Sequence, residues 1–187
     1  MDYAKVLQDM PVLAGATGVW DGTYRHFDAD CRLVDEHAVR LICRVADPQL
    51  EPYLAVQTNL YTWADGRREV RTFEGTLRDG RMWFDNALIR GWSGDLEWDQ
   101  TRRTHLVNWI RTDEADVQFY ELINLSPCGR YKNRVWQWYR NGRLDRRTLV
   151  DEVLVDRDWR RYDRPEYTAH LRFASGRPLA SAAGVAA

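Results

Sequence analysis

The sequence predicts an all-β fold, an antiparallel up-and-down β-barrel of about eight to ten strands, lipocalin-like, with a short N-terminal helix. Segments rich in Trp, Tyr, Val, Ile and Thr recur along the chain, and these residues suit the pleated, half-buried surface of a sheet. Short turn sequences separate the segments, namely Asp65-Gly66-Arg67, Asp79-Gly80-Arg81, Cys128-Gly129-Arg130 and Asn141-Gly142-Arg143. Asp-Gly and Asn-Gly tolerate the positive φ angles that tight hairpins require, so consecutive segments are expected to pair as hairpins.

These turns delimit about ten strands. A further turn, Asp30-Cys31-Arg32, carries cysteine where the pattern expects glycine, which predicts a longer or different turn. The expected strands are 18–27, 32–45, 52–63, 68–77, 81–90, 94–99, 103–112, 117–126, 130–140 and 143–155. An open sheet of this size would leave long exposed edges, and closure into a barrel removes them.

The two ends of the chain differ from this pattern. Residues 1–17 form a lead-in in which Asp2–Met10 can make two helical turns that Pro11 stops; the segment is expected to plug the barrel or to lie on its surface. One more strand is expected at Tyr167–Phe173, and residues 174–187 read as an Ala-rich tail. The chain is therefore one barrel domain, 18–173, between a lead-in and a flexible tail.

Composition excludes several classes of protein. The 187 residues carry 27 basic and 28 acidic side chains, whereas a nucleic-acid binder more often shows a basic excess. No apolar run approaches the ~20 residues of a membrane helix, and the N-terminus lacks the pattern of a signal peptide, so a cytoplasmic protein is expected. The three cysteines and four histidines show no metal-ligand spacing in the sequence, and neither a disulfide framework nor a cofactor is predicted.

Because side chains alternate along a strand, the inward-facing residues of a strand are known once one of them is assigned, and we assign Trp20 to the interior. With Trp20 pointing into the barrel, Gly22, Tyr24 and His26 point inward as well, and the polar residues between them point outward. Other strands carry large or polar groups on both faces. Either the interior is partly polar, or a partner subunit of a homodimer covers part of the exterior.

Several stretches resemble a known family. Gly18-Val19-Trp20 resembles the Gly-x-Trp motif that opens lipocalins and their calycin relatives. A wider set of segments resembles a poorly characterised bacterial lipocalin-like family over residues 18–155, namely Gly18–Asp28, Gln57-Thr58-Asn59, Tyr61-Thr62-Trp63, Arg78-Asp79-Gly80-Arg81 and Arg134–Arg140. This resemblance implies an antiparallel barrel with an apolar cavity. It also implies a late-strand arginine packed on Trp20, for which Arg146 and Arg147 are the two choices.

A second resemblance lies near the C-terminus. Residues 168–172 (Thr-Ala-His-Leu-Arg) are similar to the histidine-bearing end of nitrobindin-type haem barrels, although the other motifs of that family do not align. The similarity implies haem ligation by His170 as a remote alternative.

Three inward residues are the candidate catalytic groups. His26 titrates near neutral pH and suits a general acid or base. Tyr24 lies two residues away on the same face and could donate a proton. Glu121 stands in an apolar row, where desolvation would raise its pKa into a range useful for proton transfer.

Six further residues are expected to contact a ligand. Asn59 and Asn86 could hold a carbonyl oxygen as it gains charge, and Arg134 could bind an acidic group or pair with Glu121. Trp136, Trp138 and Gln57 complete the expected pocket.

These residues support one leading hypothesis and one alternative. The leading hypothesis is a barrel that binds a small hydrophobic metabolite and performs cofactor-free acid–base chemistry on it, as an isomerase, cyclase, hydratase or lyase of secondary metabolism. The alternative is a carrier that sequesters or delivers an apolar ligand. A carrier predicts that the polar candidates lie outside the barrel or pair with one another.

Overall fold

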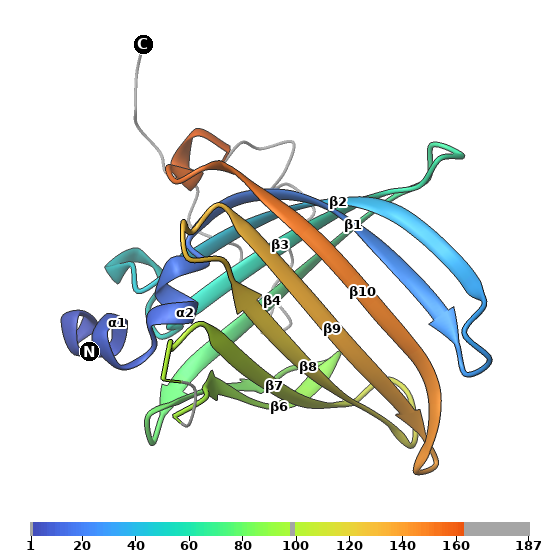
Figure 1. Cartoon of the computed structure of the whole chain (residues 1–187). Coiled ribbons are helices and arrows are strands. Elements are labelled where there is room, and N and C mark those ends of the chain that lie inside the picture. The colour runs from blue at the N-terminus through green and yellow to red at the C-terminus, as the bar shows by residue number, and fades with distance from the viewer. Residues whose placement is uncertain (1, 98–99, 163–187) are drawn as a thin grey trace.

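Ten antiparallel strands close into a barrel in the computed structural model, which describes residues 2–97 and 100–162 (Figure 1). Around the ring the order is β1-β10-β9-β8-β7-β6-β5-β4-β3-β2, so every strand pairs with its sequence neighbours and β1 closes against β10. The strands are β1 (Gly18–Asp28), β2 (Leu33–Val45), β3 (Ala55–Thr62), β4 (Arg68–Arg78), β5 (Arg81–Asp85), β6 (Ile89–Asp95), β7 (Thr104–Arg111), β8 (Val117–Leu125), β9 (Tyr131–Arg140) and β10 (Arg143–Asp156). The predicted fold class is confirmed.

The fifth and sixth strands are placed differently from the sequence prediction. A single strand over 81–90 is wrong, because the chain turns between β5 and β6 at Asn86. The side-chain oxygen of Asn86 accepts hydrogen bonds from the backbone N–H groups of Leu88 (2.9 Å) and Ile89 (3.0 Å). Asparagine stabilises turns in this way, and β6 consequently begins at Ile89.

Two short helices lie at one end of the barrel, α1 (Tyr3–Asp9) and α2 (Pro11–Gly15) (Figure 1). Pro11 does not simply end the helical segment; it takes the first turn of α2, where a missing N–H costs nothing. The backbone N–H of Val12 donates to Asp95 Oδ2 at 2.7 Å, which ties α2 to β6. Val6, Met10 and Leu13 are buried and belong to the same core cluster as Trp20.

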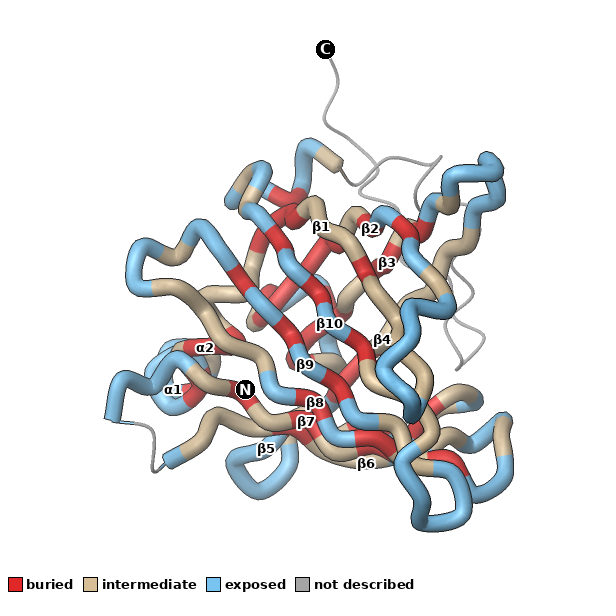
Figure 2. Tube along the Cα trace, turned by 45° about the vertical axis from the view of Figure 1, so that its right-hand side comes forward, coloured by how far each residue is buried: buried red, intermediate tan, exposed pale blue. Residues whose placement is uncertain are grey.

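The face assignment made from Trp20 is confirmed. Trp20 and Tyr24 are fully buried in the main core, whereas Asp21 on the other face forms a two-bonded ion pair with Arg40 at 2.7 Å. The same alternation of buried and exposed residues is visible along β9 and β10 in Figure 2.

The arginine that packs on Trp20 is neither Arg146 nor Arg147, and that expectation is wrong. Arg157 lies 5.6 Å from the centre of the Trp20 ring, and it donates to the backbone oxygens of Gly15 (2.6 Å) and Thr17 (3.0 Å). Because β10 continues to Asp156, Trp20 pairs with Leu154, near the end of that strand. Arg146 and Arg147 lie toward the opposite end, beside the tip of β1.

A network of charged side chains is buried inside the barrel. Arg134 forms ion pairs with Glu121 and with Glu152 (3.3 Å) and also donates to Tyr24 Oη at 2.7 Å. Lys132 pairs with the second oxygen of Glu152 at 2.9 Å. All four charged side chains are at most 5% exposed. The interior is therefore partly polar, which is the first of the two explanations offered above for strands with polar groups on both faces.

The outer surface carries several large apolar residues. Those on β7 to β10 include Ile110, Tyr120, Leu122, Val135, Leu149 and Val153. The three cysteines are free thiols, of which Cys43 is buried and Cys31 and Cys128 are exposed. In the described part of the chain, no helix is long and apolar enough to cross a membrane. The expected strand 167–173, His170 and the tail lie outside the described residues.

The buried network makes a stability prediction. Arg134→Met should lower the free energy of unfolding by about 3–5 kcal/mol, because it leaves two carboxylates buried without their common partner. Urea denaturation followed by circular dichroism measures the loss. The control is Arg25→Met, which breaks two exposed ion pairs and should cost less than about 1 kcal/mol. Equal losses in the two variants would contradict a special role for the buried network.

Candidate functional site

Residues at one end of the barrel line a cavity of about 370 Å³. The two helices lie at the other end of the barrel (Figure 1). The hairpin connections β1–β2, β3–β4, β5–β6, β7–β8 and β9–β10 all lie at the end with the cavity. Side chains near these connections form the mouth, and side chains deeper on the strands form the walls. The helices α1 and α2 cover the other end of the barrel, and no described helix covers this one.

The walls of the cavity are largely aromatic. Phe119 stacks on Trp136 with 5.4 Å between ring centres and 17° between planes, and Trp109 meets Phe119 edge to face at 5.0 Å. The complete aromatic lining is Tyr24, Tyr61, Trp63, Phe73, Trp109, Phe119, Trp136 and Trp138. Ring faces and edges of this kind offer apolar contact to a flat organic molecule.

Charged residues surround the mouth. The arginines there are Arg67, Arg71, Arg111, Arg140 and Arg146, and the acidic residues include Glu69, Glu114 and Asp145. Most of them pair with one another, as Arg140 does with Glu114 at 2.9 Å and Arg71 with Glu69 at 2.5 Å. The mouth therefore has many hydrogen-bonding groups and little excess charge.

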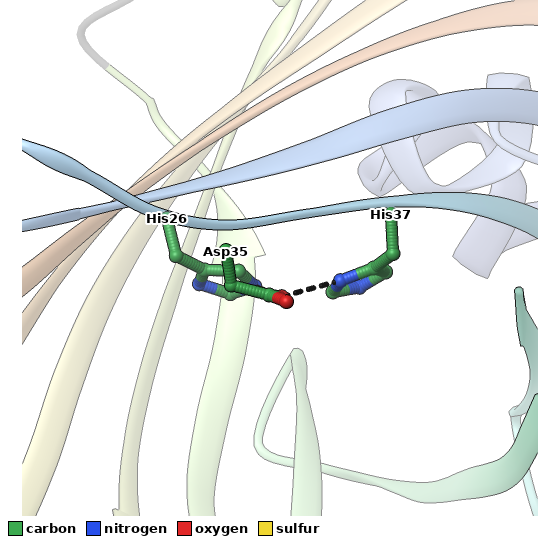
Figure 3. Close-up of side chains that lie close together, drawn as sticks. All are labelled: His26, Asp35 and His37. Atoms are coloured by element: carbon green, nitrogen blue, oxygen red, sulfur yellow. Dashed lines mark hydrogen bonds and ion pairs between the residues drawn. The ribbon is translucent and has the colours of Figure 1, made fainter. Parts of the chain in front are cut away.

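Two histidines and an aspartate meet in the wall near the mouth (Figure 3). Asp35 Oδ2 lies 2.7 Å from His37 Nδ1 and 3.9 Å from His26 Nε2. The other oxygen, Oδ1, accepts a hydrogen bond from Trp63 Nε1 at 2.9 Å. Burial alone would raise the pKa of Asp35, but the hydrogen bonds from His37 and Trp63 outweigh it and hold this pKa below its usual value.

The hydrogen bond to Asp35 sets the roles of the two nitrogens of His37. With Nδ1–H donated to the ionised carboxylate, the neutral ring carries its lone pair on Nε2. Within the described residues, Nε2 has no hydrogen-bond partner. The tautomer is assigned from this network. His37 thus has the arrangement of a carboxylate-oriented base.

His26 is held as a neutral imidazole. Its Nδ1 lies 2.8 Å from Thr148 Oγ1, and that hydroxyl oxygen accepts a hydrogen bond from Trp138 Nε1 at 2.9 Å. The pKa of His26 is lowered to about 4: burial is the largest cause, neighbouring His37 adds to the lowering, and Asp35 partly opposes both. His26 is therefore uncharged at neutral pH, contrary to the near-neutral titration expected from sequence.

Strand register brings this cluster together. β1 pairs with β2 so that Tyr24 faces His37 and His26 faces Asp35. The His37 ring stacks on Tyr24 and on His26, with 5.3 Å between ring centres in each case. Sequence reasoning named His26 and Tyr24 but missed Asp35 and His37. The signal available was the pair Asp-x-His on one face of the strand that follows the β1 turn.

The other candidate catalytic residues lie in different surroundings. Tyr24 lines the cavity, and its hydroxyl oxygen accepts from Arg134; burial raises the pKa of Tyr24 well above its usual value, and the charge of Arg134 opposes this. Glu121 forms its ion pair with Arg134 deeper in the barrel. It lines a smaller cavity of about 70 Å³ near α2, and not the open one.

The candidate ligand-binding residues also divide between the two halves of the barrel. Trp136 and Trp138 line the open cavity, whereas Gln57 and Arg134 line the smaller one. Asn59 lies between the two, accepting from Gln57 Nε2 (2.8 Å) and donating to Tyr61 Oη (2.7 Å). The side-chain oxygen of Asn86, as described above, holds the β5–β6 turn.

Fold and cavity together define an antiparallel up-and-down β-barrel with a cavity at one end. Among solved structures, the chain is similar to the S-type phycobiliprotein lyase CPES from Guillardia theta (TM-score 0.59, 11% identity, 76% of this chain and 90% of that one). It is also similar to a DUF3598-family protein of unknown function from Nostoc punctiforme (TM-score 0.57, 16% identity, 76% of this chain). The aligned part spans about half, 49%, of the length of the DUF3598 protein.

These likenesses support the lipocalin-like architecture that the sequence resemblance implies, at the level of the fold. No protein-family model matches the chain. No curated protein sequence matches it significantly.

The lowered pKa of His26 predicts how stability depends on pH in the metal-free protein. The folded-state pKa of about 4 lies below the ordinary value of 6.5, so the unfolded chain binds the proton more readily. The free energy of unfolding should therefore fall by about 2 kcal/mol from this residue as the pH drops from 6.5 to 4. Urea denaturation at several pH values, with a chelator present, measures this slope. His26→Gln should show a shallower slope, and identical slopes would contradict the assignment.

Proposed function

We propose that the protein binds a small, largely apolar and flat organic molecule in the open cavity and performs acid–base chemistry on it. The main observation that supports this proposal is a hydrogen-bonded histidine–carboxylate pair in the wall of an aromatic cavity of about 370 Å³. The reaction types that fit are those expected from the sequence: isomerisation, cyclisation, hydration or elimination. Each needs a proton taken from one atom and returned to another.

The size and lining of the cavity support this class of ligand. Its volume falls at the small end of the ~300–1,000 Å³ that small-molecule sites occupy. Aromatic faces stabilise flat apolar groups, and the charged mouth can receive one polar end of the molecule. A ligand in this cavity would be within reach of Trp136, Trp138 and Phe119 and of the histidine cluster, which all line it.

His37 is the best-placed general base of the described residues. Asp35 holds Nδ1–H, which leaves the Nε2 lone pair free to take a proton and places a negative charge where it stabilises the resulting imidazolium. His26 lies beside it as a neutral hydrogen-bonding group. Tyr24 stacks on His37 and lines the same cavity, so it could also contact the ligand. Glu121 has no place in this proposal, because Arg134 already engages it.

A non-catalytic carrier is the second candidate, and one observation favours it. The polar interior residues largely satisfy one another: Glu121, Glu152, Lys132 and Arg134 pair together, and Asn59 bonds to its neighbours. Mutual pairing of this kind is what a carrier predicts. The two functions share a binding site and differ in whether His37 transfers a proton.

Ligand binding can be tested with the fluorescent probe 8-anilinonaphthalene-1-sulfonate in chelator-treated protein. Probe fluorescence should rise on titration, and Trp138→Ala should weaken the affinity about three- to tenfold through loss of an aromatic contact. The matched control is Trp92→Ala, which removes a tryptophan outside the cavity lining that packs under Arg81. Equal affinities in the two variants would contradict binding in the open cavity.

Proton transfer can be tested with 5-nitrobenzisoxazole, a flat probe whose ring opens when a base removes the proton on its carbon. Formation of the coloured phenolate, followed in chelator-treated protein, should slow by about 10²-fold in His37→Gln, because a positioned base typically contributes that much or more. His105→Gln, which alters a histidine outside the open cavity, is the control. An unchanged rate in His37→Gln with the probe still bound would favour the carrier.

A further inference from the structure

We infer that His26, Asp35 and His37 form a binding site for one divalent transition-metal ion, with Zn²⁺ as the best-matched probe. The inference goes beyond the proposed function, because it requires no organic ligand. Imidazole nitrogens and a carboxylate oxygen are ordinary zinc ligands, and three protein ligands with an open position are typical of zinc sites that act on other molecules.

Distances between the ligand atoms support a single shared ion. One such atom from each of the three side chains can be chosen so that all lie within 4.8 Å of one another. Ligands at ~2.0–2.2 Å from one zinc ion are themselves roughly 3–3.5 Å apart. The observed separations of 2.7 Å and 3.9 Å from Asp35 Oδ2 bracket that value. Small side-chain rotations, with the two paired strands unchanged, would bring the three atoms onto one ion.

Hydrogen bonds behind the cluster orient two of the three side chains. Thr148 holds His26 at Nδ1, so the other ring nitrogen, Nε2, faces Asp35. Trp63 holds Asp35 at Oδ1, which leaves Oδ2 toward the histidines. Outer partners that fix the ring orientation of a metal-binding histidine and the free oxygen of a carboxylate are a regular feature of metal sites.

The metal ion would take the position of a proton. In the metal-free cluster, one proton lies between Asp35 Oδ2 and His37 Nδ1. A bound ion would displace it from Nδ1, and the proton would move to Nε2 of the same ring, so the imidazole changes tautomer when Nδ1 coordinates the ion. The carboxylate of Asp35, whose pKa is held below its usual value, gives the cluster a negative charge that favours a cation. Arg146 lies close enough to oppose a cation, and its pairing with Asp145 at 3.6 Å reduces that effect.

A second buried histidine–aspartate pair shows the contrast. His105 Nδ1 lies 2.7 Å from Asp95 Oδ1, and the other oxygen of Asp95 accepts from the backbone N–H of Val12. That pair ties β7 and β6 to α2, and it is not grouped with a third metal-ligating side chain among the described residues. It therefore supplies a matched histidine for the control experiment.

The test is isothermal titration of the full-length, chelator-stripped protein with Zn²⁺, without any organic ligand. One ion per chain should bind, and His26→Gln, Asp35→Asn and His37→Gln should each abolish or strongly weaken that binding. Thr148→Val should keep the stoichiometry and weaken affinity about 10- to 100-fold, as loss of an outer partner does. His105→Gln, His170→Gln and Cys31→Ser should bind as the wild-type protein does.

A second measurement needs no substitution, in case a variant does not fold. Paramagnetic Co²⁺ added to the wild-type protein should broaden the indole N–H signals of Trp63 and Trp138 first, because both lie next to the cluster. The absence of Zn²⁺ binding would overturn the inference, and so would wild-type affinity in the His26→Gln/His37→Gln double variant. Neither result would affect binding of the fluorescent probe in the open cavity. The metal-site inference and the proposed ligand binding can therefore be rejected independently.

Discussion

The width of a ten-stranded barrel is the constraint on which the rest of this structure depends. About eight strands already enclose a space that side chains just fill, so ten leave more interior than an apolar core occupies. This extra interior space is occupied differently at the two ends of the barrel. At one end α1 and α2 bury Val6, Met10 and Leu13 in the same core cluster as Trp20, and only a small cavity of about 70 Å³ is left there. At the other end nothing among the described residues covers the opening, and a cavity results.

The buried ion network separates these two halves. Arg134 reaches Glu121 and Glu152 on the closed side, while its guanidinium lies under the rings of Tyr24 and Trp136, which line the open cavity. Long charged side chains occupy width that apolar ones would leave empty, provided that each charge has a partner. The same residues therefore serve as filling for the closed half and as support for the aromatic floor of the open half. This explains why Glu121, although inward and buried, is engaged structurally.

Local signals in the sequence were sufficient for most of the strands, for the Asp-Gly and Asn-Gly turns and for the interior face of β1, because these signals act over a few residues. They did not predict the turn at Asn86 between β5 and β6. They were insufficient for the cluster. Near the turn Phe27 pairs with Leu33, but His26 pairs with Asp35, so Val34 is an extra residue in β2. Without this bulge Asp35 and His37 would point outward, since a slip of one residue exchanges the faces of a strand. No residue type in this part of β2 predicts the bulge. The register of β2 against β1 determines where it forms.

This bulge also explains why one cluster supports two proposals. It places Asp35 between two imidazoles, in a wall where hydrogen bonds from Trp63 and Thr148 hold the outer atoms and leave the inner ones facing each other. A carboxylate oxygen that faces two imidazole nitrogens is stabilised by a proton or a metal cation between them. With a proton on His37 Nδ1, Nε2 is available as a base. A divalent ion in the same position would shift that proton to Nε2 and would leave a coordination position open to a ligand in the cavity. The two proposed states exclude each other, because His37 cannot be a free base at Nε2 while Nδ1 coordinates an ion.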